Sequence, residues 1–184
     1  MQTPSGQTTA PPLQALLADG ALAGQWILDP GQSSIRLQNR SVAGLLRVTG
    51  VFREVSGNGT VSPDGEVRGT VTVAAASVDT KNTRRDTHLR SADFFDSDGH
   101  PDITFTVDGI RPSDAGVAVT GALTVRGQTR PLSFDATAPV QGKDQIWLDA
   151  EVPVNRADFG LTWNLMGLIS MNNTLVVHAV FTRR

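Results

Sequence analysis

The sequence predicts an all-β fold in which about eight antiparallel strands form a barrel or a sandwich. Apolar residues recur at every second position in successive segments from Trp26 onward, as expected for strands with one buried face. Turn signals such as Asn58-Gly59 and Pro63-Asp64-Gly65 separate the segments at hairpin spacing. The 18 glycines and the many Val and Thr residues fit the same fold class.

Residues 1–22 are predicted to form a flexible N-terminal tail with a short helix, and residues 23–184 a single barrel domain. Residues 1–12 are polar and rich in Thr, Gln and Pro, a composition typical of disorder. Leu13, Leu16 and Leu17 would share one helical face, with Gly20 as a stop signal. We expect this helix to pack over one end of the domain rather than to bind a partner.

The alternating segments follow one another along the rest of the chain. They lie at residues 26–28, 35–37, 46–52, 67–75, 103–107, 117–125, 132–136, 146–152 and 175–181. Within one of them, Val67, Val71 and Val73 fall on one face, and Arg68 and Thr70 fall on the other. This alternation is what a sheet with one polar and one apolar face requires.

The composition excludes several functional classes. The chain has 184 residues and a formal charge of −2 with both signs interspersed, so it shows no electrostatic footprint for nucleic acid. It has no cysteine, which excludes disulfides and thiolate metal sites, and no apolar run long enough to span a bilayer. Because Arg36 is the first basic residue, we expect a cytoplasmic protein, or a periplasmic or secreted one if a leader has been removed.

Small residues at positions that the alternation predicts to face the interior favour a barrel with room inside. Gly50, Gly69, Val71, Gly121 and Ala150 stand where a filled core would need Leu or Phe. An eight-stranded barrel is either filled by its own side chains or holds one small ligand, and small inner residues favour the ligand. The alternative is that these glycines only permit curvature or bulges in the sheet.

Residues 77–105 form the longest interruption of the strand pattern. Thr83 followed by Asp86 has the spacing of a capping box, which predicts a short helix in which Asp86 also pairs with an arginine. Ser91 would cap a second turn, and Leu89 would point inward. The segment is expected to lie as a helical plug across one end of the barrel.

The charged residues of this segment have a catalytic and a structural interpretation. His88 with Asp86 could act as a general acid–base pair, but a polar helix surface explains them more simply. Asp96, Asp98 and His100 offer ligands for a hard metal, yet the spaced oxygens and terminal Glu of a calcium loop are missing. We therefore predict no metal site, no cofactor and no enzymatic activity.

Residues 161–171 are too irregular for a strand and too apolar for a solvated loop. Trp163, Met166 and Met171 would give an adaptable apolar flap over a barrel mouth. A hairpin docked on the outside of the sheet, or a dimer contact, is the competing interpretation.

Several motifs resemble those of the YceI-like family of lipocalin-like, polyisoprenoid-binding proteins. The most specific is RDTHLRSADFFD at residues 85–96, with HPDITF directly behind it. WILDP at residues 26–30, GALTVRGQTRP at 121–131 and NRADFGL at 155–161 follow in register. The resemblance covers nearly the whole chain after the N-terminal tail.

This resemblance implies an eight-stranded antiparallel, lipocalin-like barrel with short helices covering one end. It also implies an isoprenoid-like lipid or isoprenoid quinone in the apolar interior, for storage, transport or sequestration, and leaves a homodimer open. Such a lipid would co-purify with the protein. Where many members carry histidines after Asp-Pro and at the end of that strand, this chain has Gln32, Arg36 and Arg40. The arginines could contact a phosphate, a carboxylate or a quinone oxygen, or could instead form salt bridges to aspartates at the barrel end.

The predicted ligand site follows from these arguments. Its apolar channel and mouth comprise Leu37, Val48, Phe52, Val71, Val73, Leu89, Phe94, Phe95, Phe105, Leu123, Phe134, Trp163, Met166 and Met171. Arg36, Arg40 and His88 are the candidate contacts to a head group. Two alternatives to lipid binding remain: an enzyme that uses His88 and Asp86 at the barrel mouth, and a dimeric interaction module without a ligand.

Overall fold

The fold is described from a computed structural model, which covers residues 13–41, 45–141, 144–164 and 167–184. Its strands are β1 (Gly24–Leu28), β2 (Ser34–Ser41), β3 (Leu46–Phe52), β4 (Val55–Val61), β5 (Val67–Ala74), β6 (Val78–Asp79), β7 (Asp102–Ser113), β8 (Gly116–Val125), β9 (Gln128–Ala136), β10 (Val140–Gln141), β11 (Gln145–Asn155) and β12 (Ile169–Arg183). Its helices are α1 (Leu13–Ala18) and α2 (Thr83–Arg90), with the 3-10 turns η1 (Ala75–Ser77) and η2 (Arg156–Phe159).

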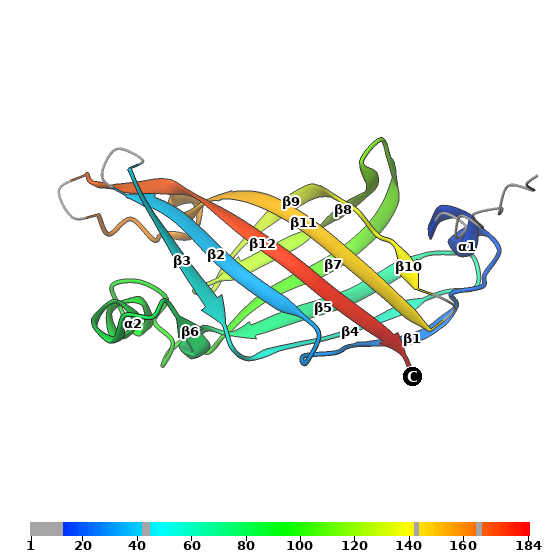
Figure 1. Ribbon diagram of the computed structural model, residues 1–184, viewed down its shortest axis with the longest axis horizontal. Coiled ribbons are helices and arrows are strands. Elements are labelled where there is room, and N and C mark those ends of the chain that lie inside the picture. The colour runs from blue at the N-terminus through cyan, green and yellow to red at the C-terminus, as the bar shows by residue number, and fades with distance from the viewer. Residues whose placement is uncertain (1–12, 42–44, 142–143, 165–166) are drawn as a thin grey trace, which may run out of the picture.

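All the strands belong to one antiparallel sheet (Figure 1). Several are consecutive pieces of one longer strand. β12 pairs with β1 through residues 181–183 and with β2 through residues 169–178, so β1 and β2 lie end to end along it. On the next position of the sheet, β4 pairs with β1 and β3 pairs with β2, so β3 and β4 lie end to end. In the same way, β5 pairs with β4 and β6 pairs with β3, so β5 and β6 lie end to end. Joined in this way, the pieces give the eight strands that the sequence predicts.

The sheet curls until its two sides meet between β9 and β11. Thr137, just beyond β9, donates its backbone N–H to the Asp149 carbonyl at 3.0 Å and accepts the Asp149 N–H at 2.9 Å. Trp147 adds a bond from its N–H to the Pro139 carbonyl at 3.1 Å. These bonds close a ring of strands around an apolar interior.

The two helices lie at opposite ends of the barrel, α1 near β10 and α2 beside β6, whereas the sequence predicted helices at one end (Figure 1). Leu13 of α1 and Leu22 are buried in the same core cluster as Trp26 of β1. The Trp26 indole N–H donates to the Leu22 carbonyl at 2.9 Å. The short helix therefore shares a core with the barrel, and residues 1–12 of the predicted tail lie outside the described part of the chain.

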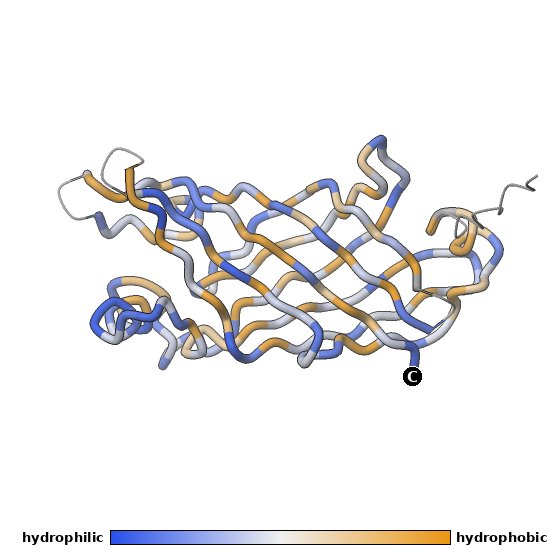
Figure 2. The backbone as a smooth tube through the Cα atoms, viewed as in Figure 1, coloured by the Kyte–Doolittle hydropathy of each residue, from blue (hydrophilic) through white to orange (hydrophobic). Residues whose placement is uncertain are grey.

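The core occupies the interior of the barrel in two contiguous clusters, one toward α2 and one toward α1. Hydropathy alternates along the strands as the sequence predicts (Figure 2). β8 shows the alternation most regularly, because every second residue from Val117 to Val125 is buried. One face of the sheet thus supplies the interior and the other faces solvent.

The glycines on the inner face do not all leave open space. At Gly121 an added Cβ would collide with the Thr106 carbonyl oxygen and would lie 2.7 Å from Cζ of Phe105. The space left by this glycine is filled by the Phe105 ring, which reaches across from β7. At Gly50 the methyl groups of Thr80 and Val78 take the same role. The prediction that small inner residues create the room is therefore wrong at these two positions.

Replacing Gly121 by Ala should destabilise the protein by about 1–3 kcal/mol, because an added methyl group forces a well-packed interior apart. Urea unfolding measures the change. Gly109→Ala is the matched control on the adjacent strand, since an added Cβ there would meet only Oγ1 of Thr120, at 3.6 Å. Equal stabilities for the two variants would contradict the tight packing of Phe105 against Gly121.

Candidate functional site

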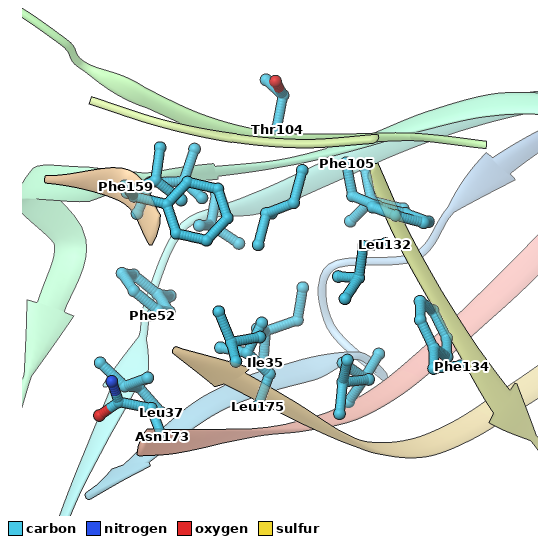
Figure 3. Close-up of a pocket in the computed structure, with 18 of the residues that line it drawn as sticks. Ile35, Leu37, Phe52, Thr104, Phe105, Leu132, Phe134, Phe159, Asn173 and Leu175 are labelled. Carbon is cyan, nitrogen blue, oxygen red and sulfur yellow. The ribbon is translucent and has the colours of Figure 1, made fainter. Parts of the chain in front are cut away.

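The interior of the barrel holds an apolar cavity of about 160 Å³. Its walls are aliphatic and aromatic side chains from strands on all sides of the ring (Figure 3). Among its lining residues, only Thr104, Arg156 and Asn173 are polar. Thr104 points away from the apolar side chains that surround the space (Figure 3). A cavity with almost entirely apolar walls suits an apolar ligand.

Most of the predicted channel residues line this cavity. They are Leu37, Phe52, Val71, Val73, Phe94, Phe95, Phe105, Leu123 and Phe134. The strand residues in this set lie on the inner face because strand side chains alternate between two faces. Phe94 and Phe95 come instead from the segment after α2, with ring centroids 4.9 Å apart in an edge-on arrangement.

Other predicted channel residues lie outside the cavity. Leu89 packs against the core cluster without lining the cavity. Val48 lies on the inner face of β3 opposite Asn39, further out than the cavity. Trp163 is 37% exposed and Met171 belongs to β12, and neither lines the cavity. Met166 lies outside the described residues.

The predicted head-group residues Arg36 and Arg40 do not line the cavity. Ile35 and Leu37 line it, so Arg36 between them points outward and is exposed. Arg40 is also exposed, on the same outer face. Contact of either guanidinium with a head group stays a prediction.

A second apolar cavity, of about 100 Å³, lies in the half of the barrel that α1 covers. Leu13 and Leu17 of α1 are among its walls. Five side chains line both cavities, and they mark where the two spaces adjoin: Val71, Val107, Val119, Leu148 and Phe181. The Phe105 and Phe134 rings pack against each other near the boundary between the two cavities, with their centroids 5.4 Å apart.

The size of each cavity limits what it can hold in this conformation. An engineered apolar cavity of about 150 Å³ holds one benzene molecule. Each cavity here therefore accommodates a group of about that size, and a long chain requires the two to join. Among the described residues, Phe181 is the only aromatic one that lines both cavities, so movement of its ring is the simplest way to join them.

Arg156 is the charged residue of the cavity, and only 3% of it is exposed. Its Nη1 donates to the Leu161 carbonyl and to the Trp163 carbonyl, the latter at 2.7 Å, and its Nε donates to the Ser170 carbonyl at 3.2 Å. The guanidinium lies 5.6 Å from the centre of the Phe94 ring. Burial lowers the pKa of Arg156 from its usual value, yet an arginine stays charged under all ordinary conditions.

The sequence argument missed Arg156, although the signal was present. Ala150, Val152 and Val154 alternate along β11, with Val152 and Val154 on the cavity wall. Continuing the period by one step places Arg156 on the same inner face. An arginine that continues the alternation of buried valines is therefore expected to lie on the inner face of the sheet.

Two asparagines stand beside this arginine. Asn39 of β2 pairs with Asn173 of β12 in the sheet, and its Nδ2 donates to Oδ1 of Asn173 at 2.6 Å. The same Nδ2 donates to the Ser170 carbonyl at 2.9 Å, which Arg156 also contacts. Arg156, Asn39 and Asn173 therefore form one polar cluster at an end of the cavity.

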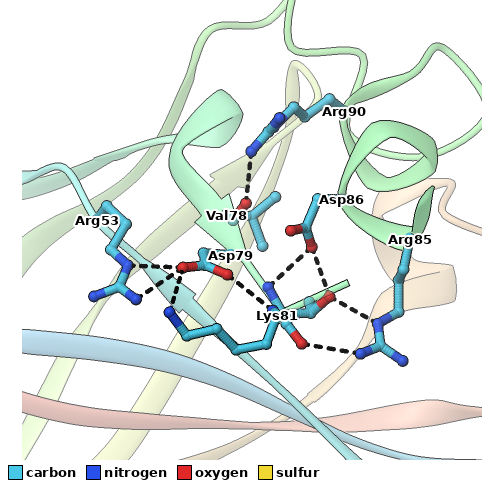
Figure 4. Close-up of polar contacts among 8 residues, drawn as sticks. Arg53, Val78, Asp79, Lys81, Arg85, Asp86 and Arg90 are labelled. Atoms are coloured by element: carbon cyan, nitrogen blue, oxygen red, sulfur yellow. Dashed lines mark hydrogen bonds and ion pairs between the residues drawn. The ribbon is translucent and has the colours of Figure 1, made fainter. Parts of the chain in front are cut away.

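The segment around α2 is held by a buried carboxylate (Figure 4). Asp86, 7% exposed, accepts the Thr80 N–H at 2.9 Å and the Thr80 hydroxyl at 2.6 Å. Arg85 donates to the Thr80 hydroxyl and carbonyl rather than to Asp86. The predicted capping box is wrong, because Asn82 is the N-cap and accepts the Arg85 N–H at 3.0 Å.

Asp79 fastens the same segment to the barrel from the outside (Figure 4). Its carboxylate accepts from Arg53 Nη2 at 2.8 Å and from Lys81 Nζ at 3.1 Å. The Arg53 hydrogen bonds, followed by those of Lys81, hold the pKa of Asp79 well below its usual value. The Arg53 contact joins β6 to the turn after β3, and the Lys81 contact is local to the end of β6.

His88 is separated from Asp86 by its packing. Its ring centroid lies 4.2 Å from that of Trp163 and 6.4 Å from that of Phe94. His88 does not line the cavity, and its Nε2 is buried without a hydrogen-bond partner. The structure thus brings the predicted histidine to an aromatic cluster, not to a carboxylate.

Within the residues that the structure describes, no group of three or more His, Asp or Glu side chains is placed to hold a metal ion. None of the described helices is long and apolar enough to cross a membrane. His178 of β12 bonds Asp149 of the neighbouring strand β11 at 2.6 Å through Nδ1.

Large apolar side chains are exposed where β2, β3 and β12 meet. Leu45 is 82% exposed, and Leu46 and Leu168 are also exposed. Leu46 pairs with Ser41, which also pairs with Ile169, so these residues belong to one end of the barrel. The predicted flap at residues 161–171 is thus divided between a buried part, with Leu161 on the cavity wall, and an exposed part at this end.

Comparison with known proteins gives consistent matches. A family model described as "YceI-like domain" matches residues 26–181. A UPF0312 protein of Photorhabdus laumondii is 34% identical over 135 residues, which cover 70% of this chain and 69% of the relative. A UPF0312 protein of Serratia proteamaculans is 31% identical over 173 residues, or 88% of each chain. Protein YceI of Escherichia coli is 36% identical over 100 residues, or 52% of each.

Solved structures show the same fold. The BcnA structure from Burkholderia cenocepacia superposes with a TM-score of 0.75 at 20% identity, covering 83% of this chain and 98% of that one. A polyisoprenoid binding domain from Saccharophagus degradans gives a TM-score of 0.71 at 19% identity, covering 86% and 98%. The Campylobacter jejuni YceI protein gives 0.61 at 28% identity, covering 74% and 86%. These likenesses confirm the predicted all-β class.

Proposed function

The chain belongs to the YceI-like domain family, and from this membership and the apolar interior we propose that it binds an isoprenoid-like lipid inside its barrel. The observation that carries the proposal is the cavity of about 160 Å³ with almost entirely apolar walls. The neighbour from Saccharophagus degradans, described as a polyisoprenoid binding domain, supports the choice of lipid class. An isoprenoid quinone fits the same description.

Burial of apolar surface would supply the binding energy. At about 25 cal/mol per Å², roughly 400 Å² of buried chain contributes about 10 kcal/mol before the entropy losses of association. A long chain would thread from the cavity beside Phe94 into the one beside α1, past Phe181. The interior then serves as a solvent-free compartment for storage, transport or sequestration.

Binding explains the site better than catalysis does. The predicted acid–base pair is not assembled, because Asp86 bonds Thr80 while His88 packs against Trp163. Among the described residues that line the larger cavity, Arg156 is the one charged group, and its Nε and Nη1 donate to backbone carbonyls. We propose that the protein carries its ligand without transforming it.

The proposal is tested by denaturing extraction of the natively purified protein followed by lipid mass spectrometry. We expect an isoprenoid-type lipid in roughly stoichiometric amount, and uptake of an added isoprenoid quinone once the protein has been stripped. A variant whose interior is filled by a larger side chain is the control and should yield neither. A protein that carries no lipid and takes up no quinone would contradict the proposal.

A further inference from the structure

Both N–H donors on Nη2 of Arg156 are unused. Nη2 is buried and has no hydrogen-bond partner among the residues that the structure describes, whereas Nη1 and Nε are occupied by backbone carbonyls. The residue is 97% removed from solvent and forms part of the cavity wall. Buried donors are almost always paired in folded proteins, so an unpaired pair of donors on a residue of the cavity wall indicates a ligand atom.

The charge of Arg156 is also uncompensated. Among the described residues, no ion pair is formed between this guanidinium and a carboxylate. Its neighbours are neutral carbonyl groups and the face of Phe94. A cation in a low-dielectric interior attracts an anion more strongly than it would in water.

We infer that Arg156 binds the polar end of the ligand, and that this end carries an anionic oxygen such as that of a carboxylate or a phosphate. The inference rests on the proposed function, since it assigns a head group to the lipid that the interior would hold. The chain of the ligand would extend from Nη2 along the apolar walls toward Phe181. Because Nη1 and Nε are occupied, the contact involves Nη2 alone rather than the two-nitrogen fork of a bidentate pair.

The geometry also distinguishes Arg156 from a purely structural arginine elsewhere in the chain. Arg183 likewise donates to two backbone carbonyls, those of Ala21 and Ala23, and stacks on the Trp26 ring at 5.1 Å. It lies 3.6 Å from Asp144, however, and lines neither cavity. Arg183 is therefore a matched control that fastens the backbone without facing a ligand.

The test uses three probes with one chain and different head groups: hexadecanoic acid, hexadecyl phosphate and methyl hexadecanoate. Their affinities are measured by displacement of a neutral fluorescent dye from the stripped protein. We expect the acid and the phosphate to bind at least tenfold more tightly than the ester. In Arg156→Met this preference should fall to less than threefold, with the affinity for the ester retained.

Two further variants separate binding from folding. Arg156→Lys keeps the charge and should keep part of the preference, which makes the test independent of whether Arg156→Met folds. Arg183→Met should retain the full preference.

Equal binding of acid and ester by the wild type, or an unchanged preference in Arg156→Met, would overturn the inference while leaving lipid binding intact. Failure of all three probes to bind would instead count against the proposed function. A preference for the acid over the phosphate, or the reverse, identifies the head group.

Discussion

Replacing Ala179 by Phe should abolish lipid uptake while the barrel remains folded. Ala179 is buried on β12 and lines the larger cavity. The change adds one phenyl ring, and a cavity of about 150 Å³ is filled by one benzene molecule. A cavity of about 160 Å³ therefore loses the space that a ligand would need. We expect affinity for a dye or lipid to fall by at least about thirtyfold, which corresponds to about 2 kcal/mol.

The matched control places the same ring on the outer face of the same strand. Val176 pairs with Arg36 on one side and Glu151 on the other, both of them exposed. Val176→Phe should bind lipid as the wild type does. Overpacking is expected to cost Ala179→Phe about 1–3 kcal/mol of stability, so circular dichroism must first show that both variants are folded. Undiminished uptake by folded Ala179→Phe would place the ligand outside the larger cavity.

Replacing Asp86 by Ala should lower the free energy of unfolding by about 3 kcal/mol, since hydrogen bonds to a charged group contribute about 1.5–3 kcal/mol and their loss leaves buried partners unpaired. The Thr80 N–H and hydroxyl both donate to this carboxylate in a buried position. For a domain of this size, such a change corresponds to a fall in Tm of roughly 6–12 °C. Urea unfolding and a thermal scan measure the two quantities.

Two variants calibrate this effect. Asp86→Asn keeps one acceptor oxygen and should cost about half as much. Asp93→Ala removes an exposed carboxylate from the same segment and should change stability by less than about 0.5 kcal/mol. If Asp86→Ala were as stable as Asp93→Ala, the Thr80 contacts would not be what holds α2 at the end of the barrel.

Strand alternation predicted much of the fold and the cavity wall. The period of two placed Val71, Val73, Phe105 and Leu123 inside, and all four line the cavity. The same rule places Arg36 on the outer face and Arg156 on the cavity wall, although Arg156 was not among the predicted site residues. Where the pattern is regular, the side-chain direction can therefore be predicted without a structure.

Contacts that depend on the path of a turn could not be predicted. Asp86 has helix-capping spacing, yet it bonds Thr80 because the chain between them turns through Lys81, whose φ of 61° is left-handed. Likewise, the space at Gly121 is filled by Phe105 only because β7 and β8 pair Val107 with Gly121 and Phe105 with Leu123. Turn conformation and strand register are properties of the assembled sheet.

The pairing of β12 has a consequence for how the molecule folds. Trp26 lies opposite Arg183, and Leu37 lies opposite Leu175, so strands distant in sequence are neighbours in the ring. β11 occupies the other edge of β12. Until residues 169–183 dock, β1, β2 and β11 present unpaired edges and the interior stays open to solvent. Such long-range closure makes folding slow and leaves its intermediates prone to edge-to-edge association. It also gives a lipid its least obstructed route into the barrel, before the last strand pairs.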